Sequence, residues 1–233
     1  MITWDLCTFT WITVGAIATA LVVLINVAIL FVIPCCRRPE FSIEYDTGGK
    51  FCHPARCTSF LDLKTELPTY WIRLGIRNTG KSVARRCRGK LVKVLDEHGE
   101  EKQEYDTMLL HWVITPWKEV PFRTIDLNRD ENEYLNLLAT QSNNKEAYFA
   151  GDQFPLAKSA KDEPRAIPNS LPRGKYILVI TVYGDDVKPE TKYLSLIWHA
   201  DDMKHVCVEL HDDLQNAKSW LNERELTSAV GQP

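Results

Sequence analysis

The longest hydrophobic stretch of the chain lies at its N-terminus. Residues 6–36 contain no Asp, Glu, Lys, Arg or His, and residues 11–33 are almost entirely apolar. A bilayer core about 30 Å thick is crossed by roughly 20 helical residues, so this stretch predicts a transmembrane helix. A signal peptide would begin with basic residues and carry a shorter apolar core, whereas this chain begins MITWD. We therefore expect a retained anchor rather than a cleaved signal.

Beyond residue 38, short apolar segments alternate with turn-forming residues. Residues 41–45 and 70–76 place every second apolar residue on one face, which is typical of half-buried strands. Residues 175–183 are apolar on both faces and predict a central strand. Further strands are expected at residues 91–95, 108–114, 122–127, 147–150, 193–198 and 205–210.

The remaining segments are predicted from Gly, Pro and helical spacing. Residues 48–68 and 151–174 carry repeated Gly or Pro and are expected to be loops. Residues 134–138 fit a strand or a short helix, and residues 213–226 predict an amphipathic C-terminal helix. Short strands without alternating helices indicate a β-sandwich, so the predicted fold is mainly β. The expected division is an anchor (1–38), a juxtamembrane strand and loop (39–68), the β-sandwich domain (69–211) and a C-terminal helix and tail (212–233).

Two segments resemble a known family. The stretch WIRLGIRNTGKSVA (71–84), followed by Cys87-x-Gly89-x-Leu91, resembles the strand–turn–strand of immunoglobulin-like (CARDB-type) β-sandwich domains of bacteria and archaea. Gly174-Lys-Tyr176 is similar to the late GxY strand of those domains. The resemblance implies an immunoglobulin-like sandwich with a binding or spacer role and no catalytic residues. Domains of this family are often extracellular.

Flanking charge predicts the orientation of the anchor. No Lys or Arg precedes the apolar run, whereas Arg37, Arg38, Lys50 and Arg56 follow it. The positive-inside rule then places the N-terminus outside and the β domain in the cytoplasm of a single-pass cell-membrane protein. Cytoplasmic cysteines are expected to be reduced. The alternative is an extracytoplasmic domain.

Charged residues are segregated in the middle of the chain. Acidic residues from 96 to 106 follow a run of basic residues, and cross-strand pairing of the two runs is the simplest interpretation. The alternative is a basic face that contacts anionic lipid headgroups of the adjoining leaflet. Nucleic acid is not an expected partner, because the net charge is −3 and few aromatic residues interleave with the basic run. The candidate basic face comprises Arg73, Arg77, Lys81, Arg85, Arg86, Arg88, Lys90 and Lys93.

Two clusters carry metal-ligand residue types. Thiolate, imidazole and carboxylate are zinc ligands, but Cys87 and Cys207 are the only further domain cysteines and are interpreted as core residues. The second cluster, which contains His199, Asp201 and His205, is most simply a polar turn between strands. The candidate metal residues are Cys52, His53, Cys57, His199, Asp201 and His205.

No catalytic signature is found: Gly-x-Ser-x-Gly, a Walker-type loop and His-Glu-x-x-His are all missing from the sequence. We therefore expect no enzyme and no cofactor. The sequence favours a membrane-anchored recognition or scaffolding module with an unidentified protein partner. A membrane-anchored metal-binding or hydrolytic domain is one alternative, and an extracytoplasmic adhesion or envelope module is the other.

Overall fold

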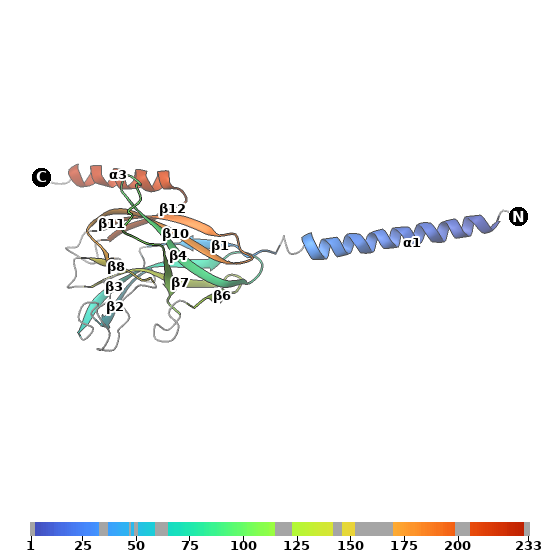
Figure 1. Cartoon of the computed structure of the whole chain (residues 1–233), viewed down its shortest axis with the longest axis horizontal. Coiled ribbons are helices and arrows are strands. Elements are labelled where there is room, and N and C mark those ends of the chain that lie inside the picture. The colour runs from blue at the N-terminus through green and yellow to red at the C-terminus, as the bar shows by residue number, and fades with distance from the viewer. Residues whose placement is uncertain are drawn as a thin grey trace.

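A computed structural model describes residues 3–32, 37–46, 48, 51–58, 65–114, 123–141, 146–151, 170–198 and 206–230. An N-terminal helix, α1 (Thr3–Val27), continues into a π-helical turn, η1 (Ala28–Val32). A second helix, α3 (Leu214–Val230), ends the described chain. Figure 1 shows α1 projecting from one end of a β domain and α3 lying over one of its faces.

The N-terminal helix has the expected length and composition. Its segment Thr13–Phe31 is long and apolar enough to cross a membrane, and none of its side chains is buried. The hydroxyl of Thr19 donates to the carbonyl of Gly15 at 2.8 Å, which satisfies this polar group within the helix. The prediction of an apolar N-terminal helix is confirmed.

Twelve strands occur in the described part of the chain, and every pairing between them is antiparallel. Their bounds are β1 (Phe41–Glu44), β2 (Cys52–Thr58), β3 (Glu66–Asn78), β4 (Ala84–Asp96), β5 (Met108–Trp112), β6 (Ile125–Leu127), β7 (Asn132–Gln141), β8 (Ala147–Phe149), β9 (Ser170–Leu171), β10 (Gly174–Asp185), β11 (Glu190–Trp198) and β12 (Val206–His211).

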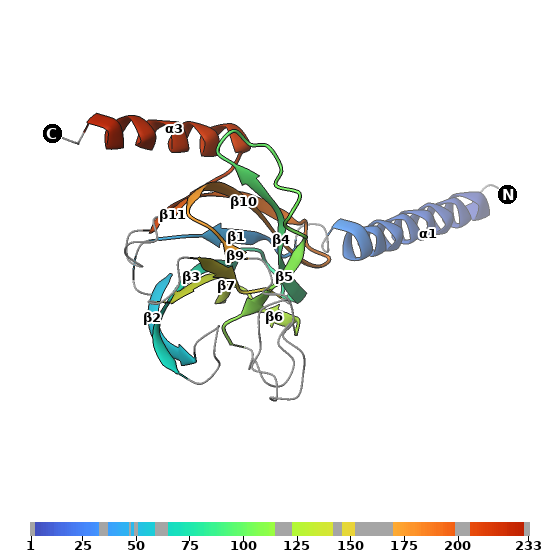
Figure 2. The same cartoon turned by 60° about the vertical axis from the view of Figure 1, so that its left-hand side comes forward.

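The main path through the sheet runs β1-β3-β7-β5-β4-β10-β11-β12. Strand β5 joins its two halves, because its first residues pair with β4 and its last two pair with β7. The sheet therefore curls into a nearly closed barrel, with β1 and β12 at the two ends of the path (Figures 1 and 2). The prediction of a mainly β domain is confirmed.

Apolar side chains from all parts of the sheet fill the barrel. Leu74 of β3, Leu135 of β7 and Leu178 of β10 are completely buried. The alternating pattern of β3 predicts this for Leu74, and the two-sided apolar pattern of β10 predicts it for Leu178. A side chain at Gly89 would collide with that of Leu135, so this position needs glycine. Burying these aliphatic side chains is the main stabilising contribution, at about 25 cal/mol per Å² of apolar surface.

Helix α3 covers the outer face of β10 and β11. Its Ala217 and Leu221 are buried against Ile177 and Ile197. The carboxylate of Asp213 accepts a hydrogen bond from the backbone N–H of Asn216, an N-cap that fixes where the helix begins. The predicted C-terminal helix is confirmed.

Both loop predictions are wrong in part. Residues 52–58, expected to be loop, form β2, which pairs with the first half of β3 while β1 pairs with its second half. Pro54 is tolerated because, among the described strands, β2 has a neighbour on one side only, so the missing N–H costs no ladder bond. The ambiguous segment 134–138 is strand β7. In the other predicted loop, 151–174, residues 170–171 instead form the short strand β9, which pairs with β8, and Gly174 begins β10, while residues 152–169 lie outside the described part.

Candidate functional site

The three domain cysteines whose side chains the structure describes, Cys52, Cys87 and Cys207, lie in three different environments. Cys52 is half-buried on the edge strand β2, with its Sγ 3.1 Å from Tyr45 Oη. Cys87 is buried in the barrel core, where burial raises the pKa of its thiol to about 12, and Cys207 lies beneath α3. Among the described residues, no three His, Cys, Asp or Glu side chains are grouped to hold a metal ion.

The structure describes the remaining metal candidates only in part. The backbones of His53 and Cys57 belong to β2, opposite Trp71 and Leu67, but their side chains lie outside the described part. His199, Asp201 and His205 also lie outside it.

The eight residues of the candidate basic face are divided between two strands and the turn that joins them. Arg73 and Arg77 lie on β3, Lys81 lies in the β3–β4 turn, and the other five lie on β4. The other five are Arg85, Arg86, Arg88, Lys90 and Lys93.

Several of these basic residues have polar partners. Arg77 pairs with Asp130 at 3.3 Å and Arg86 with Asp185, both from distant parts of the chain. Arg73 Nε donates to Asn136 Oδ1 at 2.9 Å.

Of the eight basic residues, Lys93 is the only one with an ion pair to the predicted acidic run in the described structure, through Glu101. Within the described residues, Lys81, Arg85, Arg88 and Lys90 show no ion pair. In the described residues, the predicted pairing between the basic run and the acidic run is therefore present for one of the eight residues rather than for the whole run.

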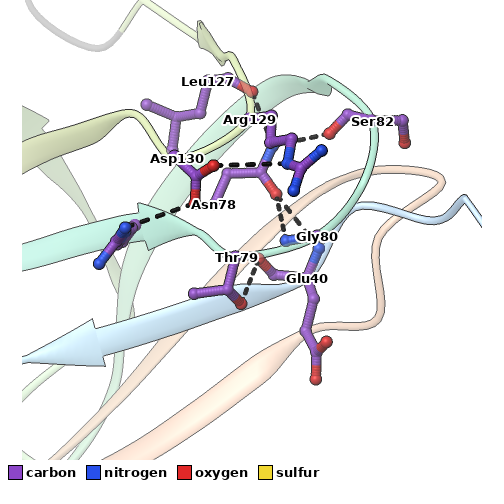
Figure 3. A network of polar contacts seen from close by, with 9 residues as sticks. Glu40, Asn78, Thr79, Gly80, Ser82, Leu127, Arg129 and Asp130 are labelled. Carbon is purple, nitrogen blue, oxygen red and sulfur yellow. Dashed lines mark hydrogen bonds and ion pairs between the residues drawn. The ribbon is translucent and has the colours of Figure 1, made fainter.

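A buried polar residue with an extended hydrogen-bond network is Asn78, at the end of β3 (Figure 3). It is fully buried, and its side chain makes four hydrogen bonds. Oδ1 accepts from the backbone N–H of Gly80 at 3.1 Å and of Glu40 at 3.3 Å. Nδ2 donates to the carbonyls of Ser82 at 2.7 Å and Leu127 at 3.0 Å. The amide thus joins the β3–β4 turn to the end of β6 and to the chain that precedes β1.

The β3–β4 turn holds the segment that arrives from α1. The N–H of Thr79 donates to the carbonyl of Glu40 at 2.8 Å, and the N–H of Lys81 donates to that of Arg38 at 3.2 Å. A Cβ at Gly80 would lie within 2.6 Å of the backbone of residues 38–40, so only glycine lets these two segments of the chain approach so closely. We call this arrangement of Asn78, Gly80 and residues 38–40 the clasp.

The clasp lies at one end of the barrel, which we call the helix-side pole and define as residues 37–41, 79–86, 126–131 and 185–190. Basic and acidic residues are equal in number there, seven of each. A hollow of about 470 Å³ opens between Arg38, Lys81 and Lys188, with Glu40 and Glu190 also on its wall. This pole offers local cationic contacts without a net formal charge.

Sequence reasoning found the turn of the clasp but not its role. Asn78-Thr-Gly80 after an apolar strand predicts a turn, which the structure confirms. One partner of Asn78, Glu40, lies 38 residues upstream, and no local pattern indicates that pairing.

Comparison with protein-family models, curated proteins and solved structures finds no match to this chain.

Proposed function

We propose that this chain is a single-pass membrane protein whose β domain is a non-enzymatic recognition or scaffolding module, presented in a fixed pose next to the bilayer. In this proposal α1 is a retained anchor, the N-terminus is outside and the β domain is cytoplasmic. The resemblance to immunoglobulin-like sandwiches supports a binding role. The observation that carries the proposal is the clasp, because it attaches the chain from α1 to the domain through several backbone hydrogen bonds.

Chain length restricts where the domain sits. The described helical segment reaches Val32, and the clasp begins at Arg38. Six residue steps span at most about 20 Å, even when fully extended. With α1 across a bilayer, the helix-side pole therefore faces the membrane, and the far end of β3 points away from it. A recognition surface on such a domain keeps a defined height above the lipid.

A pole that faces the membrane is also expected to contact anionic lipid headgroups. Lys81 and Lys188 border the hollow of the pole, and each basic residue near an anionic surface contributes about 1 kcal/mol. Because the pole carries equal numbers of basic and acidic residues, we expect short-range contacts rather than a long-range attraction.

The fixed pose is tested with the full chain in lipid nanodiscs that carry gadolinium on the headgroups. Thr79 lies at the pole, whereas Leu67 lies near the other end of β3, roughly 35–40 Å along the strand. Amide relaxation should be strongly enhanced at Thr79 and weakly at Leu67. In Asn78→Ala the two values should converge, whereas the control Asn132→Ala, an exposed position on β7, should keep the difference. Equal relaxation at both ends of the wild-type domain would contradict the proposal.

The two remaining parts of the proposal have their own measurements. Repeating the nanodisc experiment with neutral and with anionic lipid tests the headgroup contact. If the contact forms, the relaxation enhancement of the Lys188 amide should be stronger with anionic lipid. Protease protection in sealed oriented vesicles tests the orientation. Digestion of the domain by protease on the extracytoplasmic side of the membrane would favour the extracytoplasmic adhesion or envelope module instead.

A further inference from the structure

The first and last strands of the barrel leave a groove between them. Strand β1 pairs only with β3, and β12 pairs only with β11, among the described residues. A hollow of about 650 Å³ lies between β1 and β12, at the point where the barrel fails to close. Figures 1 and 2 both show β1 close to β11, and the two strands are in contact.

The groove exposes strand edges rather than strand faces. It is lined by consecutive residues, 43–46 on one side and 208–210 on the other. Because successive side chains of a strand point to opposite faces, a hollow that touches consecutive residues runs along the backbone edge. The N–H of Thr79 donates to the carbonyl of Glu40, so alternation along β1 directs the N–H and C=O of Ile43 toward the groove.

The chemistry of the lining is apolar at the base and acidic at the rim. Ile43 and Val208 are buried, and the rings of Tyr45 and Phe51 meet edge to face with centroids 6.0 Å apart. Among the described residues of the lining, Lys192 is the one cation, and it forms ion pairs with Glu190 and Asp212. The exposed acids of the lining are Glu44, Asp46, Glu209 and Asp212.

We propose that an extended segment of a partner protein, with alternating apolar and basic residues, adds as a strand between β1 and β12 and closes the barrel. Its backbone would use the open edges of β1 and β12, its apolar residues would cover the base, and its basic residues would meet the acidic rim. This inference rests on the proposed recognition role and names the chemistry of the partner. A second copy of this chain fits less well, because it would bring the same acidic edge against Glu44 and Glu209.

The test uses the full chain in neutral-lipid nanodiscs and fluorescent decapeptides as probes. The first probe alternates Val and Lys, the second alternates Val and Glu, and the third is the Val–Lys peptide with N-methylated backbone amides. Fluorescence anisotropy should show binding of the first probe alone. Reversing the rim charge in the double variant Glu44→Lys/Glu209→Lys should weaken that binding about tenfold or more. The exposed Glu100→Lys, in the β4–β5 connection, should leave it unchanged.

Three outcomes overturn strand addition. Equal binding of the N-methylated probe would show that the backbone edges are not used. No binding of the Val–Lys probe at millimolar concentration would exclude the site. Sedimentation of a dimer that the double variant abolishes would assign the groove to a second copy. The headgroup-relaxation difference, measured in the same nanodiscs, separates this inference from the proposed function: a retained difference without probe binding removes strand addition alone.

Discussion

Replacing Asn78 by alanine removes the centre of the clasp and should destabilise the domain by about 3 kcal/mol. The backbone N–H of Gly80 and the carbonyl of Leu127 belong to buried residues and lose their partner, at about 1–3 kcal/mol each. The groups on Glu40 and Ser82 lie on exposed or half-exposed residues and regain water, so they contribute little. This loss is a large part of the 5–15 kcal/mol that is typical of a folded domain.

The assay is urea unfolding of the full chain in detergent micelles, followed by far-UV circular dichroism. With an m-value of ~2 kcal/mol/M, the expected loss lowers the urea midpoint by about 1.5 M. Exchange of the Glu40 amide should accelerate as well, because its acceptor is gone. Asn132→Ala makes the same chemical change at an exposed position and should cost less than about 0.5 kcal/mol. An Asn78→Ala midpoint equal to that of Asn132→Ala would refute the role assigned to the amide.

Asn78→Asp is a sharper test, because it keeps the shape and reverses the hydrogen-bonding character of one atom. The second carboxylate oxygen would face the carbonyls of Ser82 and Leu127, at the positions where Nδ2 now donates. This repulsion raises the pKa of the new carboxyl above its ordinary value of about 3.9. A raised pKa in the folded state means that stability falls as the pH rises through that pKa. The deficit relative to wild type should therefore be larger at neutral pH than near pH ~4, and a deficit independent of pH would contradict this reasoning.

Three further predictions concern single positions. Gly80→Ala should destabilise the domain by more than about 2 kcal/mol in the same unfolding assay, because its Cβ would collide with the backbone of residues 38–40. Cys87 should resist iodoacetamide near neutral pH while Cys207 reacts, as mass spectrometry can show, because burial holds the pKa of the Cys87 thiol at about 12. Burial lowers the pKa of His211 against the opposing effect of nearby acids, so unfolded chains take up this proton first and stability should fall as the pH drops below ~6.5. His211→Gln should flatten that dependence in pH-dependent melting curves.

Local patterns predicted the strands whose side chains alternate cleanly. In β1 the buried positions recur at every second residue, and in β3 the most deeply buried apolar residues, Ile72, Leu74 and Ile76, do so as well. In β10 both faces are covered, as its apolar sequence predicts. Strand β2 was missed because Gly48 and Pro54 are loop-forming residues by any local criterion. Its strand conformation comes from pairing with β3, and an edge position is the setting in which a strand accepts proline.

The ion-pair partners of the candidate basic face could not be predicted from the order of charged residues along the chain. The basic run and the acidic run that follows it are adjacent in sequence, but the barrel places other acids beside the arginines. Arg77 meets Asp130 and Arg86 meets Asp185, acids 53 and 99 residues away. Those pairings depend on the order of strands in the sheet, and that order is set by long-range packing rather than by local charge.

The clasp and the groove are connected through β1, which gives the two proposals a common test. Strand β1 begins at Phe41, immediately after the clasped Glu40, and its next residues form one wall of the groove. A strand of four residues has few hydrogen bonds of its own, so its position depends on what holds its ends. Asn78→Ala should therefore weaken binding of the Val–Lys probe by several-fold, although Asn78 does not line the groove, while Asn132→Ala should leave it unchanged. Unchanged probe affinity in Asn78→Ala, together with faster exchange of the Glu40 amide, would show that the clasp positions the domain on the membrane without positioning the edge of β1.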